Sequence, residues 1–439
     1  STNAPTQKVA SFRYRVPGKF GASASYKVYY LGKNSNGSQV TISANQTQTA
    51  PNNTEHFGTA GDYGTATATG AVGGSIFSFQ LEHQPAYLVF QPYTSNTILH
   101  NCYLTKVEVT SDNDIAETYS VNTTTGALDA SAGTGSKQIV LTTSGSSTNP
   151  NGFPLTSNTA DVTTNGAYMV IKPGTHTLRV RYWVKNVATQ VEGTITKTLS
   201  QATYAPNTYY DMTANLDVKN YDGDHYYMWD AQNQYWYGYE WTKNLPAGTG
   251  QPTLNGNNSS NYAQSNADPN HRWYHEGGGT ARFDAIHTPC KNLPNVNEMT
   301  WYAAEGDPHW DADELWTTMG HLYKGGIWFK KKSVLQGEGN YNSNTAVDGT
   351  DWRTNEISNA WPVSQTLPSA ADAGNYFYLP ALGSYDSGQL YNVGNSGNYW
   401  SSSAGAWYSS NARALYFGSG SVGVSYHFRY NGFRAGEFE

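Results

Sequence analysis

The sequence predicts a mostly β protein in which two N-terminal antiparallel β-sandwich domains precede an α+β domain. Only 13% of the 439 residues are charged, whereas 14% are aromatic and 44 are glycine. This composition differs from that of disordered chains and helical bundles, and it is typical of β structure with aromatic-rich surfaces. Strand-like alternation fills the first half of the chain, and the helix signals lie after residue 290.

Apolar and polar residues alternate with a period of two through the first 218 residues. The clearest cases are Tyr26, Val28 and Tyr30; Tyr103, Thr105, Val107 and Val109; and Leu178, Val180 and Tyr182. Clusters of Gly, Asn, Ser and Thr separate these segments about every ten residues, as in antiparallel sandwiches. Because this length exceeds one small sandwich, we predict two domains, 1–133 and 134–218, with the Gly- and Ser-rich residues 131–136 as the seam.

The third predicted domain spans residues 219–439 and begins where the composition becomes aromatic and acidic. Asn295 followed by Glu298 forms a capping-box pattern, which predicts the start of a helix. A second helix is predicted over residues 311–319, because three acidic residues lie at its start and a glycine follows it. Strand-like segments resume near residue 327 and continue to the end, so this domain is predicted to be α+β.

Two kinds of residue are interleaved over residues 376–439. Bulky apolar residues such as Leu415 and Phe417 predict a rigid frame, and they alternate with residues such as Tyr416 that are predicted to point outward. Tyr provides rigid contact area and small polar residues provide adaptable hydrogen bonds in binding surfaces. We therefore predict a noncovalent ligand-binding surface made of Tyr385, Asp386, Asn392, Ser396, Asn398, Ala406, Ser409, Asn411, Tyr416, Gly423, Ser425, His427, Tyr430 and Asn431.

Structural roles compete with binding for several of these residues. Trp407 and Tyr408 suit a core as well as a ligand contact, since aromatic side chains bury large areas. Asn392, Asn398, Asn411 and Asn431 suit turns as well as ligand contacts, because Asn tolerates left-handed backbone. Tyr and His are not turn formers, so the set as a whole favours binding.

Charge and cysteine content exclude several functional classes. The net charge of −7 and the pI near 5.9 offer no electrostatic basis for a nucleic-acid partner. No run approaches the roughly 20 apolar residues that span a bilayer. Cys102 and Cys290 have no metal or redox spacing, so we expect them to stay unpaired. The chain starts at Ser1 without a methionine or a signal region, so we expect residues before Ser1 to have been removed.

Motifs for catalysis and metal binding are weak. Asp307, His309, Asp311 and Asp313 alternate but lack the Gly and the later Glu of a calcium loop, so a structural role is favoured. The Asp-Gly-Asp-His segment at residues 222–225 favours a turn, with a cation or ligand contact as the alternative. The sequence has neither a His-Glu-x-x-His pair nor a Gly-x-Ser-x-Gly elbow. We expect no catalytic residues, no metal site and no cofactor.

Four segments of the third domain occur in an order typical of one family. They are Leu293-Pro294-Asn295 with Glu298-Met299, Tyr378-Leu379-Pro380-Ala381, Tyr399-Trp400-Ser401-Ser402-Ser403, and Arg429 with Gly432-Phe433-Arg434. In this combination residues 289–439 resemble the C-type-lectin-like variable proteins served by diversity-generating retroelements. The resemblance implies a variable region at about residues 383–433, in which adenines of Asn-type codons are rewritten. Every residue type of the predicted binding set is reachable in that way.

Lectin-like relatives of that family include formylglycine-generating enzymes, whose site needs a pair of cysteines. Cys290 is the only cysteine after residue 219, so we do not expect that chemistry.

The first half is similar to another family in three segments. These are Phe77-Ser78-Phe79-Gln80-Leu81-Glu82-His83, Ala86-Tyr87-Leu88-Val89-Phe90 and Lys172-Pro173-Gly174. They resemble fimbrillin-type pilins, whose subunits contain two transthyretin-like sandwiches. The resemblance implies that other pilin subunits are partners and that assembly proceeds by strand exchange, a form of strand addition.

Together the two resemblances imply a fimbrial tip adhesin at the cell surface, either outer-membrane-associated or extracellular, that binds a protein or glycan on a host, microbial or phage surface. The alternative is a surface glycan-binding or glycan-degrading protein with pilin-like accessory domains. A glycan hydrolase needs two carboxylates about 5–10 Å apart in a groove, and the tail offers only Asp386, Glu437 and Glu439. A third possibility is a structural pilin whose tail is a cap.

Overall fold

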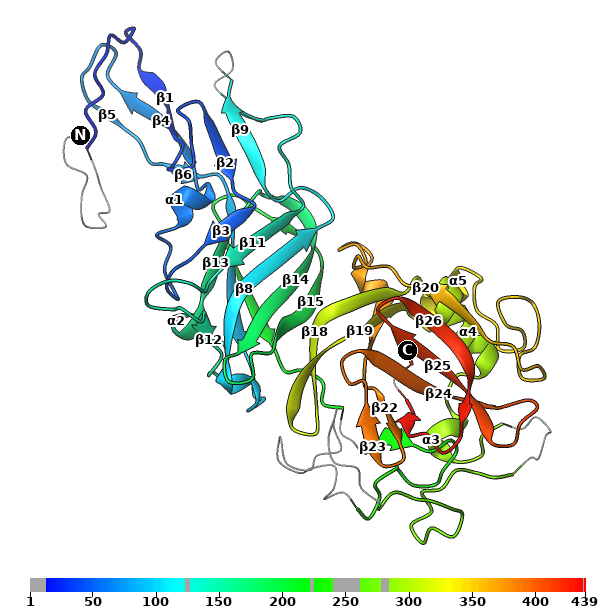
Figure 1. Cartoon of the computed structure of the whole chain (residues 1–439). Coiled ribbons are helices and arrows are strands. Elements are labelled where there is room, and N and C mark those ends of the chain that lie inside the picture. Colours follow the sequence, from blue (N-terminus) through cyan, green and yellow to red (C-terminus); the bar gives the residue numbers. More distant parts are fainter. Residues whose placement is uncertain (1–12, 123–126, 222–224, 240–260, 278–283, 437) are drawn as a thin grey trace.

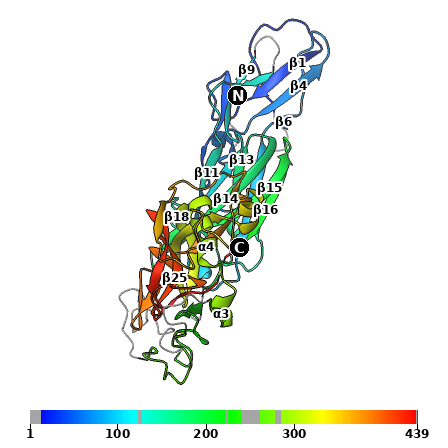
Figure 2. The same cartoon turned by 90° about the vertical axis from the view of Figure 1, so that its right-hand side faces the viewer.

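The computed structural model describes residues 13–122, 127–221, 225–239, 261–277, 284–436 and 438–439. Strands account for 43% of the structure and helices for 9%, so the prediction of a mostly β protein is confirmed. The molecule is elongated, with its N-terminal sheets at one end and its C-terminal module at the other (Figures 1 and 2).

Two small antiparallel sheets form the N-terminal end. The first has the order β1-β4-β5, with β6 also paired to β4, and the second has the order β10-β9-β2. Their strands are β1 (Ser25–Tyr30), β4 (Gly64–Gly70), β5 (Phe77–Ser78), β6 (Glu82–His83), β2 (Gln39–Ile42), β9 (Glu117–Val121) and β10 (Leu128–Ala130). This end carries several exposed apolar side chains, among them Tyr14, Val16, Phe20, Val72 and Ile76.

A sandwich follows, made of a large sheet and a three-stranded sheet. The three-stranded sheet has the order β13-β7-β16, with β13 (Ala167–Ile171), β7 (Ala86–Tyr93) and β16 (Tyr209–Asn215). The large sheet contributes β3 (Asn45–Thr47), β8 (Cys102–Ser111), β11 (Gln138–Thr142), β12 (Phe153–Pro154), β14 (Gly174–Asn186) and β15 (Glu192–Tyr204). Phe90 and Tyr182 meet edge to face across the sandwich, with ring centroids 5.9 Å apart. Alternating apolar residues from both sheets fill one buried cluster.

The predicted boundary at residues 133/134 falls inside this sheet. Strand β8 pairs with both β11 and β14, which lie on the other side of that boundary. Composition suggested a seam at residues 131–136 because Gly and Ser are frequent there. Long-range strand pairing decides the layout instead, and such pairing leaves no local signal in the sequence.

Short helices accompany the strands. In the N-terminal half they are α1 (Phe57–Ala60), α2 (Val162–Asn165) and the 3₁₀ turn η1 (Leu99–Asn101). In the C-terminal half they are α3 (Thr288–Lys291), α4 (Val296–Glu305), α5 (Lys332–Gly337) and the 3₁₀ turn η4 (Ala373–Asn375). Among the described residues, no helix combines the length and hydropathy needed to cross a bilayer. Cys102 and Cys290 are buried and unpaired, as predicted.

Helix α4 begins where the sequence predicted. The Asn295 side chain accepts a hydrogen bond from the Glu298 amide, and the Glu298 carboxylate accepts one from the Asn295 amide. Two otherwise unsatisfied amides at the helix start are thereby paired. The Val296 amide donates to the Ser403 hydroxyl at 3.1 Å, which ties the helix to the sheet beneath it.

The C-terminal module is built on a six-stranded sheet of order β17-β27-β24-β25-β26-β20. Its strands are β17 (Tyr226–Tyr227), β27 (Phe433–Arg434), β24 (Ser396–Ala404), β25 (Asn411–Gly418), β26 (Ser421–Phe428) and β20 (Asn359–Pro362). The hairpin β22 (Ser384–Asp386) and β23 (Gln389–Tyr391) lies beside it, and Tyr385 bridges to Gly432. Helix α4 contacts β24, β25 and β26.

Three further strands, β18 (His309–Thr318), β19 (His321–Lys330) and β21 (Tyr376–Pro380), join this module to the sandwich. Strand β18 extends the large sheet by pairing with β15 in parallel at Thr194 and Glu314. A buried ion pair, Arg181 with Asp311 at 2.8 Å, crosses the junction. Burial and the neighbouring Asp311 charge raise the pKa of Glu314 to about 7.

The helix predicted over residues 311–319 is wrong. The segment is strand β18, and it turns back into β19 through Met319 and Gly320, both with positive φ. The acidic residues that suggested a helix start instead pair across the sheet: Asp311 binds Arg181, and Asp313 binds Lys324 at 3.1 Å. Partners distant in the sequence therefore override the local helix signal.

Candidate ligand-binding site

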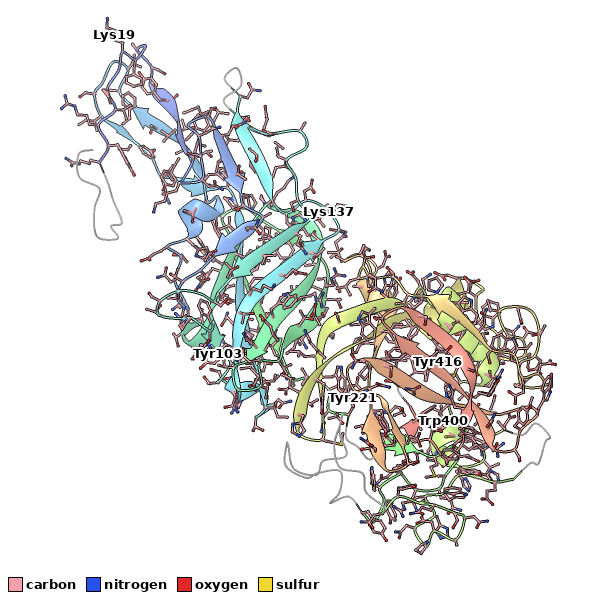
Figure 3. All side chains as sticks on the ribbon, in the orientation of Figure 1. Lys19, Tyr103, Lys137, Tyr221, Trp400 and Tyr416 are labelled. Carbon is pink, nitrogen blue, oxygen red and sulfur yellow. The ribbon has the colours of Figure 1, made fainter. Side chains whose placement is uncertain are left out.

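Strands β24, β25 and β26 bring several predicted binding residues onto one face of the six-stranded sheet. The register aligns Asn398 with Tyr416, and Tyr416 with Gly423. Ser425 and His427 follow Gly423 at intervals of two residues, so they point to the same side. On the opposite side Leu415 and Phe417 are buried beneath α4, as the alternation predicted. Figure 3 labels Tyr416 in this part of the module.

The outer face of the sheet is partly covered by a chain of aromatic rings. Tyr416 contacts His427 edge to face at 5.8 Å, His427 contacts Phe433 at 5.1 Å, and Phe433 stacks on Trp400 at 4.3 Å. Gly423 lies beneath Tyr416, since a Cβ at this glycine would come within 2.5 Å of the tyrosine ring. Tyr416, Ser425 and His427 are therefore half-buried.

Burial determines the charge state of His427. Desolvation is the main cause, and the Arg413 charge adds to it; together they lower the pKa of His427 to about 4. Its Nε2 atom is buried and has no hydrogen-bond partner among the described residues. The imidazole is consequently neutral near pH 7 and behaves as an aromatic contact.

Five aromatic residues form a second, more exposed feature where β25 begins and β26 ends, which we call the aromatic surface. Trp407 and Tyr408 are each 56% exposed, Phe428 is 52% exposed and Tyr426 is 43% exposed. Tyr430 is half-buried and stacks parallel to Phe428, with centroids 5.1 Å apart. Large exposed apolar patches are uncommon on soluble proteins and mark interaction sites.

Backbone hydrogen bonds hold the two segments of the aromatic surface together. Asn411 pairs with Phe428 in the sheet, and the Arg429 amide donates to the Ser410 carbonyl at 2.9 Å. The Arg429 guanidinium donates to the Asn411 carbonyl at 2.8 Å. Residues 410 and 411 therefore lie beside residues 428 and 429, which brings the segment that carries Trp407 and Tyr408 next to the end of β26.

A buried ion pair supports the aromatic surface from below. Glu356 accepts a hydrogen bond from the Trp407 amide at 3.1 Å and lies 3.3 Å from Arg413. Arg413 is fully buried, pairs with Tyr426 in the sheet, and donates to the Ile357 carbonyl at 2.5 Å. Desolvation lowers the pKa of Arg413 to about 10, so it remains charged and paired near neutral pH. The exposed rings thus stand on a fixed base.

Four predicted binding residues are not exposed. Tyr385 is fully buried and stacks on Tyr235 at 4.9 Å; Ala406, Asn411 and Gly423 are also buried. The prediction that these residues face solvent is wrong. Tyr385 belongs to the core because the β22–β23 hairpin packs its tyrosine inward, and Asn411 is covered by the adjoining 428–430 segment.

The remaining predicted residues are at least partly exposed. Asp386, Asn392 and Ser409 are exposed, and Asn392 adopts the left-handed backbone (φ 60°) typical of turns. Ser396, Asn398, Tyr430 and Asn431 are half-buried. Trp407 and Tyr408, for which the sequence left core and surface positions open, lie on the surface.

Tyr426 and Phe428 are functional candidates that the sequence analysis missed. They follow Val422 and Val424 at a spacing of two, so alternation assigns all four to the core. The two valines are buried, whereas the last two aromatic residues of β26 extend past the core. The valines are buried and the aromatic residues exposed because β26 is longer than the core that covers it. The sequence does not show where that core ends.

The residues proposed for structural roles are paired. His309 lies 3.0 Å from Asp307, whose carboxylate also accepts a bond from Tyr376 at 2.6 Å. Residues 222–224 lie outside the described residues, and His225 is exposed. A separate group, Asp230, His275 and His287, has the chemistry to hold a metal ion. The sequence carries no local signal for this group, because its members lie up to 57 residues apart.

Comparisons with known proteins do not identify a family. No protein-family model matches the chain, and no curated protein matches it. The solved structures that it matches include one from Bacteroides ovatus, provisionally named a cell adhesion protein, at 16% identity and a TM-score of 0.27; the match covers 44% of this chain and 62% of that one. A provisionally named cell adhesion protein from Bacteroides uniformis matches at 16% identity and a TM-score of 0.24, covering 44% and 67%.

A fimbrial protein from Bacteroides ovatus matches along more of the chain. The identity is 12% and the TM-score 0.16, with 89% of this chain and 78% of that one covered. At TM-scores this low, these likenesses establish neither a shared fold nor a function for the present chain.

Proposed function

We propose that this protein is a cell-surface adhesin whose C-terminal module binds a surface ligand noncovalently. The aromatic surface is the observation that carries this proposal, because Trp407, Tyr408, Tyr426 and Phe428 are exposed and lie on a rigid base. Exposed aromatic side chains on a fixed frame bind partners at low entropic cost. No step of turnover is part of this function.

Three residues of the predicted set carry polar groups in or beside this surface: Tyr430 within it, and Ser409 and Asn431 next to it in the sequence. These side chains can donate and accept hydrogen bonds around the aromatic centre, which is the usual arrangement of a protein or glycan interface. Tyr416, Ser425 and His427 lie on the outer face of the same sheet, whereas Tyr426 and Phe428 alternate with them along β26 and point to the other side. We propose that the three outer-face residues form a separate contact. Substitutions at these positions are the means by which a lectin-like variable region would change its ligand.

The N-terminal half serves, in this proposal, as stalk and assembly module. Val16, Phe20, Val72 and Ile76 have exposed apolar side chains and belong to the N-terminal end, which lies away from the C-terminal module (Figure 1). These residues lie in the segments that precede β1 and join β4 to β5, and exposed apolar residues are suited to contact with another subunit. We propose that pilin-type subunits bind at this end and that the C-terminal module is displayed at the fimbrial tip.

The test is binding of the full chain to arrays of glycans and surface proteins. A Trp407→Ala/Phe428→Ala double variant removes two exposed rings, and exposed substitutions of this kind usually change stability little. Tyr391→Ala is the matched control, because Tyr391 is an exposed tyrosine on β23, outside the aromatic surface. We expect the double variant to lose the array signals of the wild type and the control to keep them.

A further inference from the structure

Asp230, His275 and His287 form a compact group in the C-terminal module. One possible ligand atom from each residue lies within 4.8 Å of the other two. The Asp230 Oδ2 atom is 2.8 Å from the Nδ1 atom of His275 and 3.6 Å from the Nδ1 atom of His287. The carboxylate is fully buried, whereas the two imidazole side chains are 26% and 28% exposed. The group is thus anchored inside and open to solvent on its histidine side.

Asp230 is held rigidly in place. Its carboxylate accepts hydrogen bonds from the amides of Ile286 and His287, and its own amide donates to the Cys290 sulfur at 3.3 Å. The residue has a positive φ of 54°, which is uncommon for a residue other than glycine. Unusual backbone at a fully buried carboxylate is more frequent at functional sites than elsewhere.

We propose that these three residues bind one zinc ion, with His275 and His287 supplying nitrogen ligands and Asp230 supplying oxygen. Ligands placed about 2.0–2.1 Å from a tetrahedral zinc lie roughly 3.3 Å apart. The Asp230 Oδ2 atom lies 2.8 Å from the Nδ1 atom of His275 and 3.6 Å from that of His287, and these two distances lie on either side of that value. Two imidazoles with one carboxylate is a set that zinc accepts while keeping a fourth position for water or another ligand.

Zinc binding requires both imidazoles to rearrange. The Nδ1 atom of His275 donates a hydrogen bond to the Asp230 Oδ2 atom at 2.8 Å. The Nδ1 atom of His287 lies 2.6 Å from the carbonyl oxygen of Asp230, to which it donates in the metal-free arrangement. For Nδ1 to bind zinc, the proton of each ring moves to its Nε2 atom, which changes the tautomer and leaves the imidazole neutral.

The site lies next to the aromatic surface. The His275 carbonyl accepts a hydrogen bond from the Arg429 guanidinium at 2.9 Å, and Arg429 stands between Phe428 and Tyr430. Arg429 also lies over the Trp229 ring at 4.7 Å. A zinc ion that joins His275 to His287 would fix the segment on which the end of β26 rests.

The experiment uses the full chain without a histidine tag, dialysed against a chelator and then titrated with zinc chloride by calorimetry at pH 7.5. We expect one ion per chain with a dissociation constant of about 1 μM or tighter, and a higher melting temperature with zinc. Cobalt chloride should give visible absorption bands from nitrogen and oxygen coordination. The zinc proposal does not depend on a surface ligand, so it can fail while the adhesin proposal holds.

The single variants His275→Gln and His287→Gln should each lower the zinc affinity at least about tenfold. Even substitution of residues that only hydrogen-bond to metal ligands has effects of that size. The control is His321→Gln, which removes a partly buried histidine of β19 outside the group. Tryptophan fluorescence of every variant verifies folding without metal. Absence of a saturable site in the wild type, or equal zinc affinity in a folded His275→Gln/His287→Gln variant, would overturn the proposal.

Discussion

Adjacent residues of β25 should respond to truncation in opposite ways. Leu415 is fully buried under α4, whereas its neighbour Tyr416 points to the outer face and is half-buried. Changing each of them to alanine compares the frame with the surface at nearly the same place in the sheet. The comparison tests whether the module can vary its outer residues without losing its fold.

The expected magnitudes follow from burial. Leu415→Ala removes three buried carbons and leaves a cavity, which costs about 2–5 kcal/mol of unfolding free energy. Tyr416→Ala loses one edge-to-face contact with His427 and the cover over Gly423. An aromatic pair contributes about 0.5–1.5 kcal/mol, so the second substitution should cost about 1 kcal/mol.

Urea unfolding followed by tryptophan fluorescence measures both free energies. Of the 13 tryptophans, only Trp183 precedes residue 219, so the signal reports mainly on the C-terminal module. Ser419→Ala, in the exposed turn between β25 and β26, is a control that should stay within about 0.5 kcal/mol of the wild type. Equal losses for Leu415→Ala and Tyr416→Ala would refute the division between frame and surface.

Three further predictions follow from the same geometry. Because the folded state lowers the pKa of His427 from 6.5 to about 4, the unfolded chain binds the proton first as the pH falls. The contribution of His427 to stability should thus decline between pH 6.5 and 4, by up to about 3 kcal/mol in thermal or urea unfolding, and His427→Asn should reduce the slope by that contribution. Gly423→Ala should destabilise the wild type by about 1 kcal/mol but be nearly neutral in a Tyr416→Ala background, which a double-mutant cycle in urea measures. Asn295→Ala removes the capping box of α4 and should cost about 1 kcal/mol by the same assay.

Local signals in the sequence predicted local structure well. The capping box at Asn295 and Glu298 marks the start of α4, because the atoms that form it lie within one helical turn. The alternation of Leu415, Tyr416 and Phe417 gave the correct sides of β25, since side-chain direction in a strand follows directly from the order of residues.

Long-range contacts account for the errors. Asp311 suggested a helix start from its neighbours, but Arg181, 130 residues away, pairs with it in the sheet. Tyr385 was predicted to lie on the surface because tyrosine is frequent in binding surfaces, but it is buried against Tyr235. Phe428 has the spacing of a core residue and lies beyond the end of the core. Residue type and period do not determine which partner covers a side chain, so burial at the ends of elements could not be predicted.

Binding of the full chain to a combined glycan and surface-protein array tests the proposed adhesin function most directly. We expect the wild type to bind a restricted set of array elements, the Trp407→Ala/Phe428→Ala variant to lose them, and Tyr391→Ala to retain them. The account is contradicted if the wild type binds no element, or if the double variant binds the same elements with equal strength.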